Sequence, residues 1–219
     1  MIRILSTKKL QVNQKQFLLN AGFSVVEADF IEITNTAFTF SNIYDNLIFT
    51  STNAVKAVSS HPDVQDIRRK PCFCVGEKTA ALLDENGFTV LEIASNAAQL
   101  AEAIVSGYNS ENFTFLSGSQ RLDELPQQLK NAGIDWNETE VYQTKLTPKA
   151  INPAVDGILF FSPTAVESYL SANKIANETC FCIGNTTAKA LDKVTDKIII
   201  ANQPSVENTI IQVINHYKK

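Results

Sequence analysis

CFCVGEKTAALL (residues 72–83) and CFCIGNTTAKAL (residues 180–191) are two copies of one pattern, with seven of twelve positions identical. In each copy a short apolar run is followed by a glycine, then by Thr-Ala, then by a leucine. This order predicts a buried strand, a turn and the start of a helix. The same strand, turn and helix are therefore expected at two places in the chain.

Three further segments are duplicated in the same order, about 110 residues apart in the sequence. They are residues 19–34 with 130–144, residues 47–58 with 158–169, and residues 94–104 with 204–214. A repeat of this length is too long for a solenoid and indicates two related domains. Ligand sites often lie at domain interfaces, so the space between the two domains is the first place where a site is expected.

Composition places the chain among globular proteins. With 219 residues and 44% hydrophobic side chains, it can bury one or two cores. The net charge of −4 comes from interspersed acidic and basic residues, with no basic stripe for nucleic acid and no basic amphipathic helix for a membrane surface. The first residues, MIRILSTKKLQ, lack a signal-peptide core, and no window is apolar enough to span a membrane. We therefore expect a soluble, cytoplasmic protein with no nucleic-acid or membrane partner.

The four cysteines form two Cys-x-Cys pairs, Cys72 with Cys74 and Cys180 with Cys182. Alternate residues of a strand point to one face of a sheet, so both thiols of a pair face one layer. A metal site is the alternative, but zinc sites favour Cys-x2-Cys, and no histidine lies near either pair. The pattern favours buried free thiols in a reducing compartment.

Predicted strands and helices alternate along the chain. Strands are expected at residues 2–5, 24–33, 47–50, 72–75, 89–93 and 113–116, helices at 8–20 and from near Asn53, Lys78, Ala97 and Leu122, with a repeat of the pattern after Asp156. This alternation predicts βαβ units and parallel sheets with helices on both faces. The extended runs at residues 28–34 and 139–145 leave two arrangements open: tandem halves, or two strands that cross between the domains.

Six motifs, in order along nearly the whole chain, resemble those of the uroporphyrinogen-III synthase family. They are LIFTS-x-NAV (residues 47–55), VGEKTA (75–80), FLSG followed by GI (115–134), VYQT (141–144), FFSPTAVESYL (160–170) and IGNTTAKAL (183–191). The resemblance implies two related α/β domains with parallel sheets flanked by helices, joined by a two-stranded β-ladder. It also implies a first domain of residues 1–33 plus 147–219, a second of residues 36–139, and a linker of residues 28–36 and 139–147.

Small polar residues follow five of the predicted strands, and each group is expected to open a helix. They are Thr50 with Ser51, Gly76 with Thr79, Ser117 with Gly118, Ser162 with Pro163, and Gly184 with Thr186 and Thr187. In open α/β sheets such loops face the ligand crevice, and free N–H groups at a helix start bind carboxylates or phosphates. N-capping alone accounts for any single loop. The set on two domains favours substrate binding.

Two basic residues accompany these loops. Lys78 is expected in the first turn of a helix and Arg121 just after LSGSQ, where a guanidinium could hold a carboxylate. A solvated surface charge is the alternative for both. The chain departs from the family pattern at Thr52, Glu77 and Asn185, where proline is common. Glu77 would repel a carboxylate, which argues against anion binding by its loop.

The resemblance implies that Tyr142, in VYQT, is catalytic. It would face the cleft and assist departure of the terminal hydroxyl of hydroxymethylbilane by donating a proton or a hydrogen bond. A phenol is protonated at neutral pH and can therefore donate. An amphipathic tyrosine on a linker strand, with a buried ring and a solvated hydroxyl, is the alternative.

The implied reaction is cyclisation of hydroxymethylbilane to uroporphyrinogen III with inversion of ring D, in the inter-domain cleft. Loss of hydroxide leaves an azafulvene cation that the pyrrole stabilises, and a spiro intermediate then forms, fragments and recloses. The protein's main task would be to hold the chain in one conformation. The electron-rich substrate requires no metal, flavin or nicotinamide, so no cofactor is expected. The implied partners are the substrate and hydroxymethylbilane synthase, which would hand the substrate over transiently. The protein is expected to be a monomer.

Other functional classes stay open. His61 and His216 are the only histidines and neither lies in a repeated motif, so a Ser-His-Asp or Cys-His mechanism has no plausible base. No phosphate-binding glycine loop follows a strand. The main alternative is a non-catalytic two-domain α/β binding or sensor module for an anionic small molecule. A flavodoxin-like electron carrier is a weaker alternative.

Overall fold

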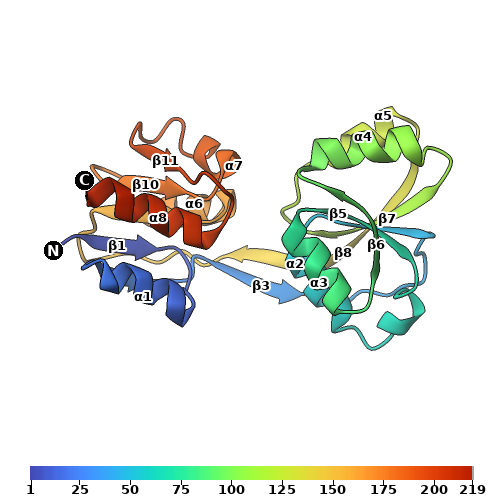
Figure 1. Cartoon of the computed structure of the whole chain (residues 1–219), viewed down its shortest axis with the longest axis horizontal. Coiled ribbons are helices and arrows are strands. Elements are labelled where there is room, and N and C mark those ends of the chain that lie inside the picture. The colour runs from blue at the N-terminus through green and yellow to red at the C-terminus, as the bar shows by residue number, and fades with distance from the viewer. Residues whose placement is uncertain (219) are drawn as a thin grey trace. The chain divides into compact units, whose positions relative to one another are not determined.

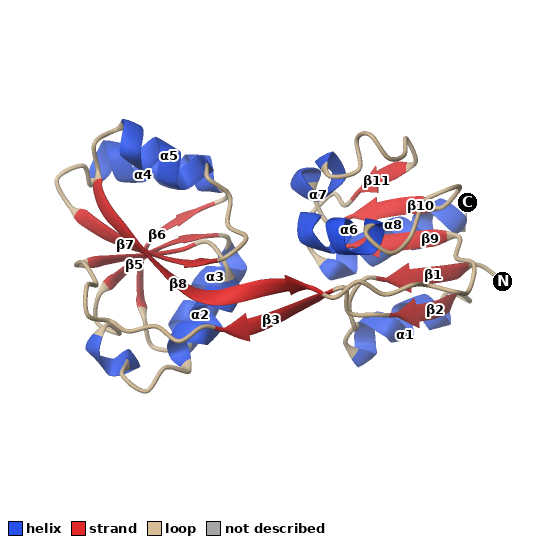
Figure 2. Cartoon of the chain, turned by 180° about the vertical axis from the view of Figure 1, so that it is seen from behind, coloured by secondary structure: helices blue, strands red, loops and turns tan. Residues whose placement is uncertain are grey.

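The computed structural model describes residues 1–218 and contains two compact units (Figure 1). Unit 1 comprises Met1–Glu32 and Lys145–Lys219, and unit 2 comprises Ile33–Thr144. Each unit contains a largely parallel sheet with helices on both faces (Figure 2). The predicted fold class, α/β with parallel sheets flanked by helices, is therefore confirmed.

Unit 2 has a six-stranded sheet in the order β3-β8-β7-β4-β5-β6. Its strands are β3 (Ile31–Asn35), β4 (Asn46–Phe49), β5 (Pro71–Val75), β6 (Thr89–Ala94), β7 (Asn112–Gly118) and β8 (Asp135–Leu146). Its helices are α2 (Thr52–Ser59), the short 3-10 helix η1 (Val64–Asp66), α3 (Glu77–Glu85), α4 (Ala97–Gly107) and α5 (Glu124–Asn131). Helix α2 packs with α3 on one face of the sheet, and α4 packs with α5 on the other (Figures 1 and 2).

Unit 1 has a five-stranded sheet in the order β11-β10-β9-β1-β2. Its strands are β1 (Arg3–Ser6), β2 (Ser24–Glu27), β9 (Gly157–Phe160), β10 (Thr179–Cys182) and β11 (Ile198–Ile200). Its helices are α1 (Val12–Asn20), α6 (Pro163–Leu170), α7 (Asn185–Lys189) and α8 (Val206–Tyr217), and they pack as the pairs α1 with α8 and α6 with α7.

The two sheets have the same spatial order of equivalent strands, but the chain enters them at different points. The sequence repeat equates β9, β10 and β2 with β4, β5 and β8, and β11 and β6 hold the same place in the chain between the duplicated segments. Unit 1, read as β2-β1-β9-β10-β11, then matches β8-β7-β4-β5-β6 of unit 2 strand for strand. Unit 1 is therefore a circular permutation of unit 2, in which β1 takes the place of β7.

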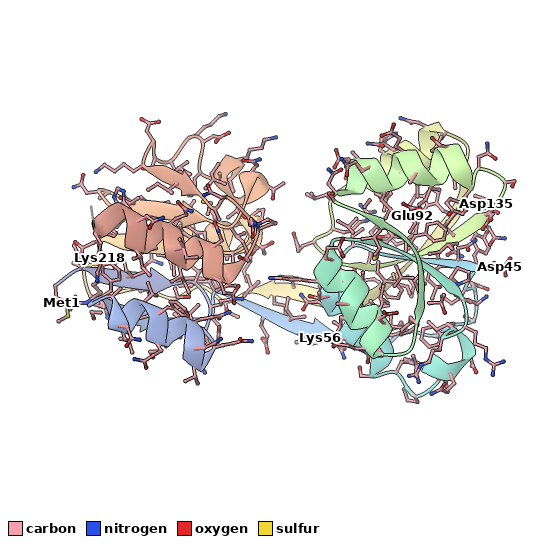
Figure 3. All side chains as sticks on the ribbon, in the orientation of Figure 1. Met1, Asp45, Lys56, Glu92, Asp135 and Lys218 are labelled. Atoms are coloured by element: carbon pink, nitrogen blue, oxygen red, sulfur yellow. The ribbon has the colours of Figure 1, made fainter. Side chains whose placement is uncertain are left out.

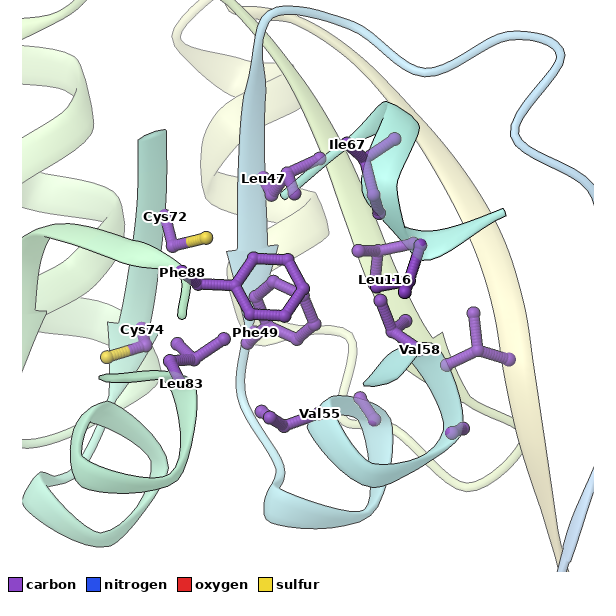
Figure 4. Close-up of a cluster of buried hydrophobic side chains, with 14 of the residues drawn as sticks. Leu47, Phe49, Val55, Val58, Ile67, Cys72, Cys74, Leu83, Phe88 and Leu116 are labelled. Carbon is purple, nitrogen blue, oxygen red and sulfur yellow. The ribbon is translucent and has the colours of Figure 1, made fainter. Parts of the chain in front are cut away.

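The core of unit 2 shows why the duplicated strands are apolar on both faces. Leu47, Phe49, Cys72 and Cys74 are fully buried on one face of the sheet, against residues of α2 and α3 (Figure 4). Phe73 faces the other side, toward α4 and α5. Strands covered by helices on both faces read as continuous apolar runs.

The cysteines are core residues. All four are free and buried, as predicted. Burial raises the pKa of Cys72, Cys180 and Cys182 to about 12, and that of Cys74 to about 11. Thiols in such a setting stay protonated and serve as small apolar groups.

Two predicted elements have different limits in the structure. The expected strand at residues 24–33 is two strands, β2 and β3, because the chain leaves the sheet so that Phe30 can enter the unit 1 core against Tyr169. The helix expected from Lys8 begins at Val12 instead. The N–H groups of Lys9 and Leu10 are bound by the carboxylates of Asp29 and Glu27, at 2.8 Å each, which holds the chain extended there.

Charged side chains such as Lys56 on α2 and Asp135 on β8 are exposed at the surface of unit 2 (Figure 3). Within residues 1–218, no helix has both the length and the apolar character that a membrane span requires. Strands β3 and β8 lie side by side in the sheet of unit 2, and each continues into unit 1 across the boundary.

Candidate active site

The strand order of unit 2 creates a topological switch point between β4 and β7. The chain proceeds from β4 through α2 to β5 on one side, and from β7 through α5 to β8 on the other. Adjacent strands whose connections leave in opposite directions open a crevice at their carboxyl ends, where α/β proteins bind ligands. The loops at this crevice start at Thr50 and Ser51 after β4, and at Ser119 after β7.

Tyr142 reaches this crevice from β8, which is not adjacent to β4. The register of β7 and β8 shifts between Ser117 and Gly118, so that Gly118 lies opposite Tyr142. A Cβ atom on Gly118 would lie 2.2 Å from Cζ of Tyr142, which shows that the ring passes directly over this glycine. Neighbouring strands lie about 4.8 Å apart. The tyrosine therefore crosses the whole width of β7, and only glycine leaves room for it.

The Tyr142 hydroxyl donates a hydrogen bond to Oγ of Ser51 at 3.1 Å. The backbone N–H of Ser119 donates to the carbonyl oxygen of Tyr142 at 3.1 Å, and the N–H of Thr144 donates to Oγ of Ser119 at 3.1 Å. Contacts at its backbone, ring and hydroxyl therefore fix Tyr142. The structure brings together three residues that the sequence singled out separately: Tyr142, Gly118 and Ser51.

Ser51 is the N-cap of α2. Its Oγ accepts a hydrogen bond from the N–H of Asn53 at 3.1 Å, and its carbonyl oxygen accepts from Ala54 and Val55. The cap thus occupies donors that would otherwise be open to an anion. Thr50 lies just before the cap and is partly buried.

Ser117 and Gly118 do not open a helix, contrary to the prediction. They end β7, and α5 begins only at Glu124. The N–H of Ser119 extends the pairing with β8 beyond the strand end, so the chain stays extended past Gly118. Oγ of Ser117, itself 3% exposed, donates to Oε1 of Glu138 at 2.6 Å.

Arg121 is bound within the protein. Its Nε donates to Oε1 of Glu138 at 2.7 Å, its Nη2 donates to Oε2 at 2.9 Å, and its Nη1 also binds Asp123. The hydrogen bonds from Arg121 hold the pKa of Glu138 below its usual value. A hollow at this place is lined by Arg121 together with Asp123, Glu138 and Glu140. Three carboxylates around one guanidinium repel further carboxylates.

The helix after β5 has a different kind of start. Gly76 is the N-cap of α3, with φ of 84°, and has no side chain with which to cap the helix. The first N–H groups of α3 are therefore left open to an anion. Lys78 is exposed in this turn, beside exposed Glu77, while Thr79 is only 4% exposed. Of the predicted binding residues in this loop, Gly76 and Lys78 are accessible.

Unit 1 has the same alternation of a serine cap and a glycine cap. Ser162 caps α6, where its Oγ accepts from the N–H of Ala165 at 3.1 Å and Pro163 occupies the first turn. Gly184 precedes α7 without a side-chain cap. Thr186 is exposed, whereas Thr187 is 1% exposed and faces the core.

Sequence reasoning missed the loop after β1. The switch point of unit 1 lies between β1 and β9, which brings residues 7–9 beside the loop that carries Ser162. The hydroxyl of Thr7 donates to the carbonyl oxygen of Leu159 at 2.7 Å, and Nζ of Lys8 lies 4.9 Å from the centre of the Phe161 ring. The signal was the polar run STKK after an apolar strand. The repeat did not point to this loop, because the permutation leaves β1 outside every repeated motif.

Within residues 1–218, no group of three or more His, Cys, Asp or Glu side chains is arranged to hold a metal ion. His61 is engaged in packing: its ring contacts Phe38 and Phe40, and its Nε2 lies 3.1 Å from the carbonyl oxygen of Phe38.

Fold and site together define a class of protein: a duplicated, permuted pair of α/β units, with capped loops at the switch point of each and one tyrosine that spans a strand. The family described as uroporphyrinogen-III synthase HemD matches residues 14–211. The chain belongs to the uroporphyrinogen-III synthase family. The predicted family and enzyme type are thereby confirmed.

Relatives agree with this assignment. A uroporphyrinogen-III synthase of Saccharomyces cerevisiae is 24% identical over 200 residues, which span 75% of this chain and 73% of the yeast protein. The crystal structure of uroporphyrinogen-III synthetase from Helicobacter pylori superposes with a TM-score of 0.76 at 21% identity, over 99% of this chain and 100% of that one. A mutant uroporphyrinogen III synthase from Thermus thermophilus gives a TM-score of 0.71 at 14% identity, over 99% and 98%. These structures show the same fold.

Proposed function

We propose that the chain cyclises hydroxymethylbilane to uroporphyrinogen III with inversion of ring D. The observation that carries the proposal is Tyr142, a phenol held over Gly118 at the switch point of unit 2 with its hydroxyl on Ser51. Membership of the uroporphyrinogen-III synthase family supplies the reaction class. Tyr142 is the proposed catalytic residue.

The chemistry requires a donor and a template. The hydroxyl of the substrate leaves as water when a proton or a hydrogen bond reaches its oxygen, and the pyrrole nitrogen lone pair stabilises the resulting cation. The cation would close to the non-inverted isomer unless ring D is held so that its substituted carbon is attacked. A few well-placed donors on a rigid frame suffice for this reaction.

The substrate is proposed to contact two kinds of loop, those with a glycine helix cap and those at the switch points. The proposed carboxylate contacts are the open N–H groups after the glycine caps, at Gly76 in unit 2 and Gly184 in unit 1, with Lys78 and Thr186 exposed nearby. Thr50 and Ser162 are proposed as further contacts at the switch points. Arg121 and Ser117 are bound to Glu138, and Thr79 and Thr187 are buried, so we propose that these four support the loops.

The remaining expectations belong to the same proposal. The substrate is proposed to contact carboxyl-end loops of both units, and the two strands β3 and β8 are proposed to form the linker between a discontinuous first domain and a continuous second one. We also propose that the protein is a cytoplasmic monomer that receives its substrate from hydroxymethylbilane synthase.

A coupled assay tests the proposal. Hydroxymethylbilane is generated by its synthase with and without this protein, the products are oxidised, and the octacarboxylic porphyrin isomers are separated by chromatography. A shift from isomer I to isomer III is expected. If a folded sample leaves isomer I unchanged, the proposed activity is wrong, and binding of the bilane without turnover would then identify a binding module.

A further inference from the structure

Ser51 occupies an unusual chemical position for a helix cap. Its Oγ accepts two hydrogen bonds, one from the Tyr142 hydroxyl at 3.1 Å and one from the N–H of Asn53 at 3.1 Å. A serine hydroxyl has two acceptor sites and one donor. Both acceptor sites are filled, and within residues 1–218 no acceptor is found for the Ser51 proton. The hydroxyl of Ser51 therefore remains available to donate to a ligand.

The hydroxyl proton of Tyr142 is less available to a ligand than that of Ser51, because it is already donated. Its ring packs over Gly118 and against the core cluster that contains Phe49 and Val141, and its hydroxyl proton is directed at Ser51. A substrate that took the phenol proton directly would have to break this hydrogen bond. A substrate that met Ser51 would leave it in place.

We propose that Ser51 is the residue that donates to the departing hydroxyl of the substrate, and that Tyr142 supplies the proton through Ser51. This inference rests on the proposed function and adds to it a second catalytic residue, because it makes Ser51 the group that touches the reacting oxygen. The relay runs from the Tyr142 hydroxyl to Oγ of Ser51 and from Oγ of Ser51 to the leaving oxygen.

The step balances without any other reactant. The C–O bond of the hydroxymethyl group breaks, its electron pair stays on oxygen, and the oxygen takes the Ser51 proton and leaves as water. Ser51 receives the Tyr142 proton in the same event and is unchanged, while Tyr142 becomes a phenolate and the substrate a cation. The proton that the ring carbon loses when the pyrrole becomes aromatic again restores the phenol.

The position of Ser51 at the helix start assists this transfer. The N-terminus of an α-helix carries a partial positive charge. Oγ of Ser51 also receives the N–H of Asn53, so negative charge that develops on this oxygen during the transfer is stabilised. The fixed helix cap positions the hydroxyl before the substrate binds.

Variants that keep the cap but remove the hydroxyl test the relay. Asparagine and aspartate cap helices about as well as serine. Ser51→Asn and Ser51→Asp are therefore expected to keep the unfolding midpoint near that of the parent protein, yet to lower kcat for isomer III on the order of tenfold or more, with KM little changed. Ser51→Thr, which keeps a hydroxyl, is expected to retain most of the turnover.

A double-mutant cycle separates a relay from two independent contacts. Residues that act as one unit give non-additive losses. Tyr142→Phe combined with Ser51→Asn is therefore expected to be no slower than the more damaging single variant. Asn96→Ala, which removes the side-chain cap of α4 in the same unit, is the matched control for cap loss and should keep the parent kcat.

These measurements either support the relay or overturn it. Full kcat in Ser51→Asn and Ser51→Asp, or losses that multiply in the double variant, would overturn the relay while the parent still makes isomer III. If the parent makes only isomer I, the proposed function itself fails. Circular dichroism of every variant shows that the comparison is made between folded proteins.

Discussion

Arg121 and Glu138 form a bidentate pair, in which Nε donates to Oε1 at 2.7 Å and Nη2 donates to Oε2 at 2.9 Å. Oε1 of Glu138 also accepts from the Ser117 hydroxyl at 2.6 Å. The guanidinium therefore fastens the loop after β7 to β8, just before the residues that hold Tyr142. The sequence suggested that Arg121 binds a substrate carboxylate, but in the structure it binds carboxylates of the protein itself.

Replacement of Arg121 should weaken the fold. Arg121→Ala removes both hydrogen bonds and leaves Glu138 without its main partner. Because the pair is still partly solvated, we expect a loss of about 1–2 kcal/mol in the free energy of unfolding. Denaturant titration measures this loss. Lys130→Ala, at an exposed position on α5, is the control and should change the stability by less than about 0.5 kcal/mol.

The same pair should make stability depend on pH. Arg121 lowers the folded-state pKa of Glu138 from the ordinary value of 4.5. The stabilisation is therefore present above pH 4.5 and is lost as the pH falls through the lower, folded-state value. We expect the unfolding free energy of the parent to fall more steeply below pH 4.5 than that of Glu138→Gln. Parallel slopes for the two proteins would contradict this role of Glu138.

Gly118→Ala should disable the tyrosine. The new methyl group would overlap the Tyr142 ring, whose nearest atom lies 2.2 Å away, so the ring and its hydroxyl must move. Overpacking of this kind costs about 1–3 kcal/mol, and we expect turnover to fall with the loss of the Ser51 contact. Gly107→Ala is the control, because nothing lies within 4 Å of its added carbon. Normal isomer III formation by Gly118→Ala would contradict the crossing of β7 by Tyr142.

The two glycine caps should respond differently to alanine. Gly76 has φ of 84°, a conformation that alanine adopts only with strain of about 1–3 kcal/mol. Gly184 has φ of −174°, an extended conformation open to any residue, with no atom near the added carbon. Thermal unfolding should therefore show a clear loss of stability for Gly76→Ala and little for Gly184→Ala. Equal losses would show that the two caps share a constraint other than φ.

The cysteines should be unreactive in the folded protein. Burial raises the pKa of Cys72 and Cys180 to about 12, and the thiolate is the nucleophilic form. Mass spectrometry after iodoacetamide treatment at pH 8 should find the native chain almost unlabelled. All four cysteines should be labelled once the chain is unfolded. Rapid labelling of a native cysteine would mean that its strand opens locally.

Much of the fold could be predicted because its signals are local. The CFCV and CFCI runs are apolar on both faces, which identified them as buried strands between helices, and the glycine or serine after each strand marked the next helix. The break after β2 could not be predicted in the same way. It depends on Phe30 packing against Tyr169, a contact between residues far apart in the sequence.

The candidate site was predictable residue by residue but not as an arrangement. Ser51, Gly118 and Tyr142 were each identified, yet nothing in their sequence positions indicated that the tyrosine crosses β7 to meet the serine. Arg121 was interpreted as free to bind a ligand because its partner, Glu138, is seventeen positions away and becomes a neighbour only through strand pairing. The catalytic role proposed for Tyr142 and the structural role of Arg121 both depend on tertiary contacts.

The permuted strand order also determines the sequence in which the units can form during synthesis. All the strands from β4 to β8 are consecutive in the chain, so unit 2 can assemble as soon as residue 144 has left the ribosome. Strand β1 can pair early with β2 on one side, but its other neighbour, β9, begins only at Gly157. One edge of the first strand made therefore stays unpaired until β9 has been synthesised, and in the meantime the nascent chain carries an open apolar edge that a chaperone could recognise.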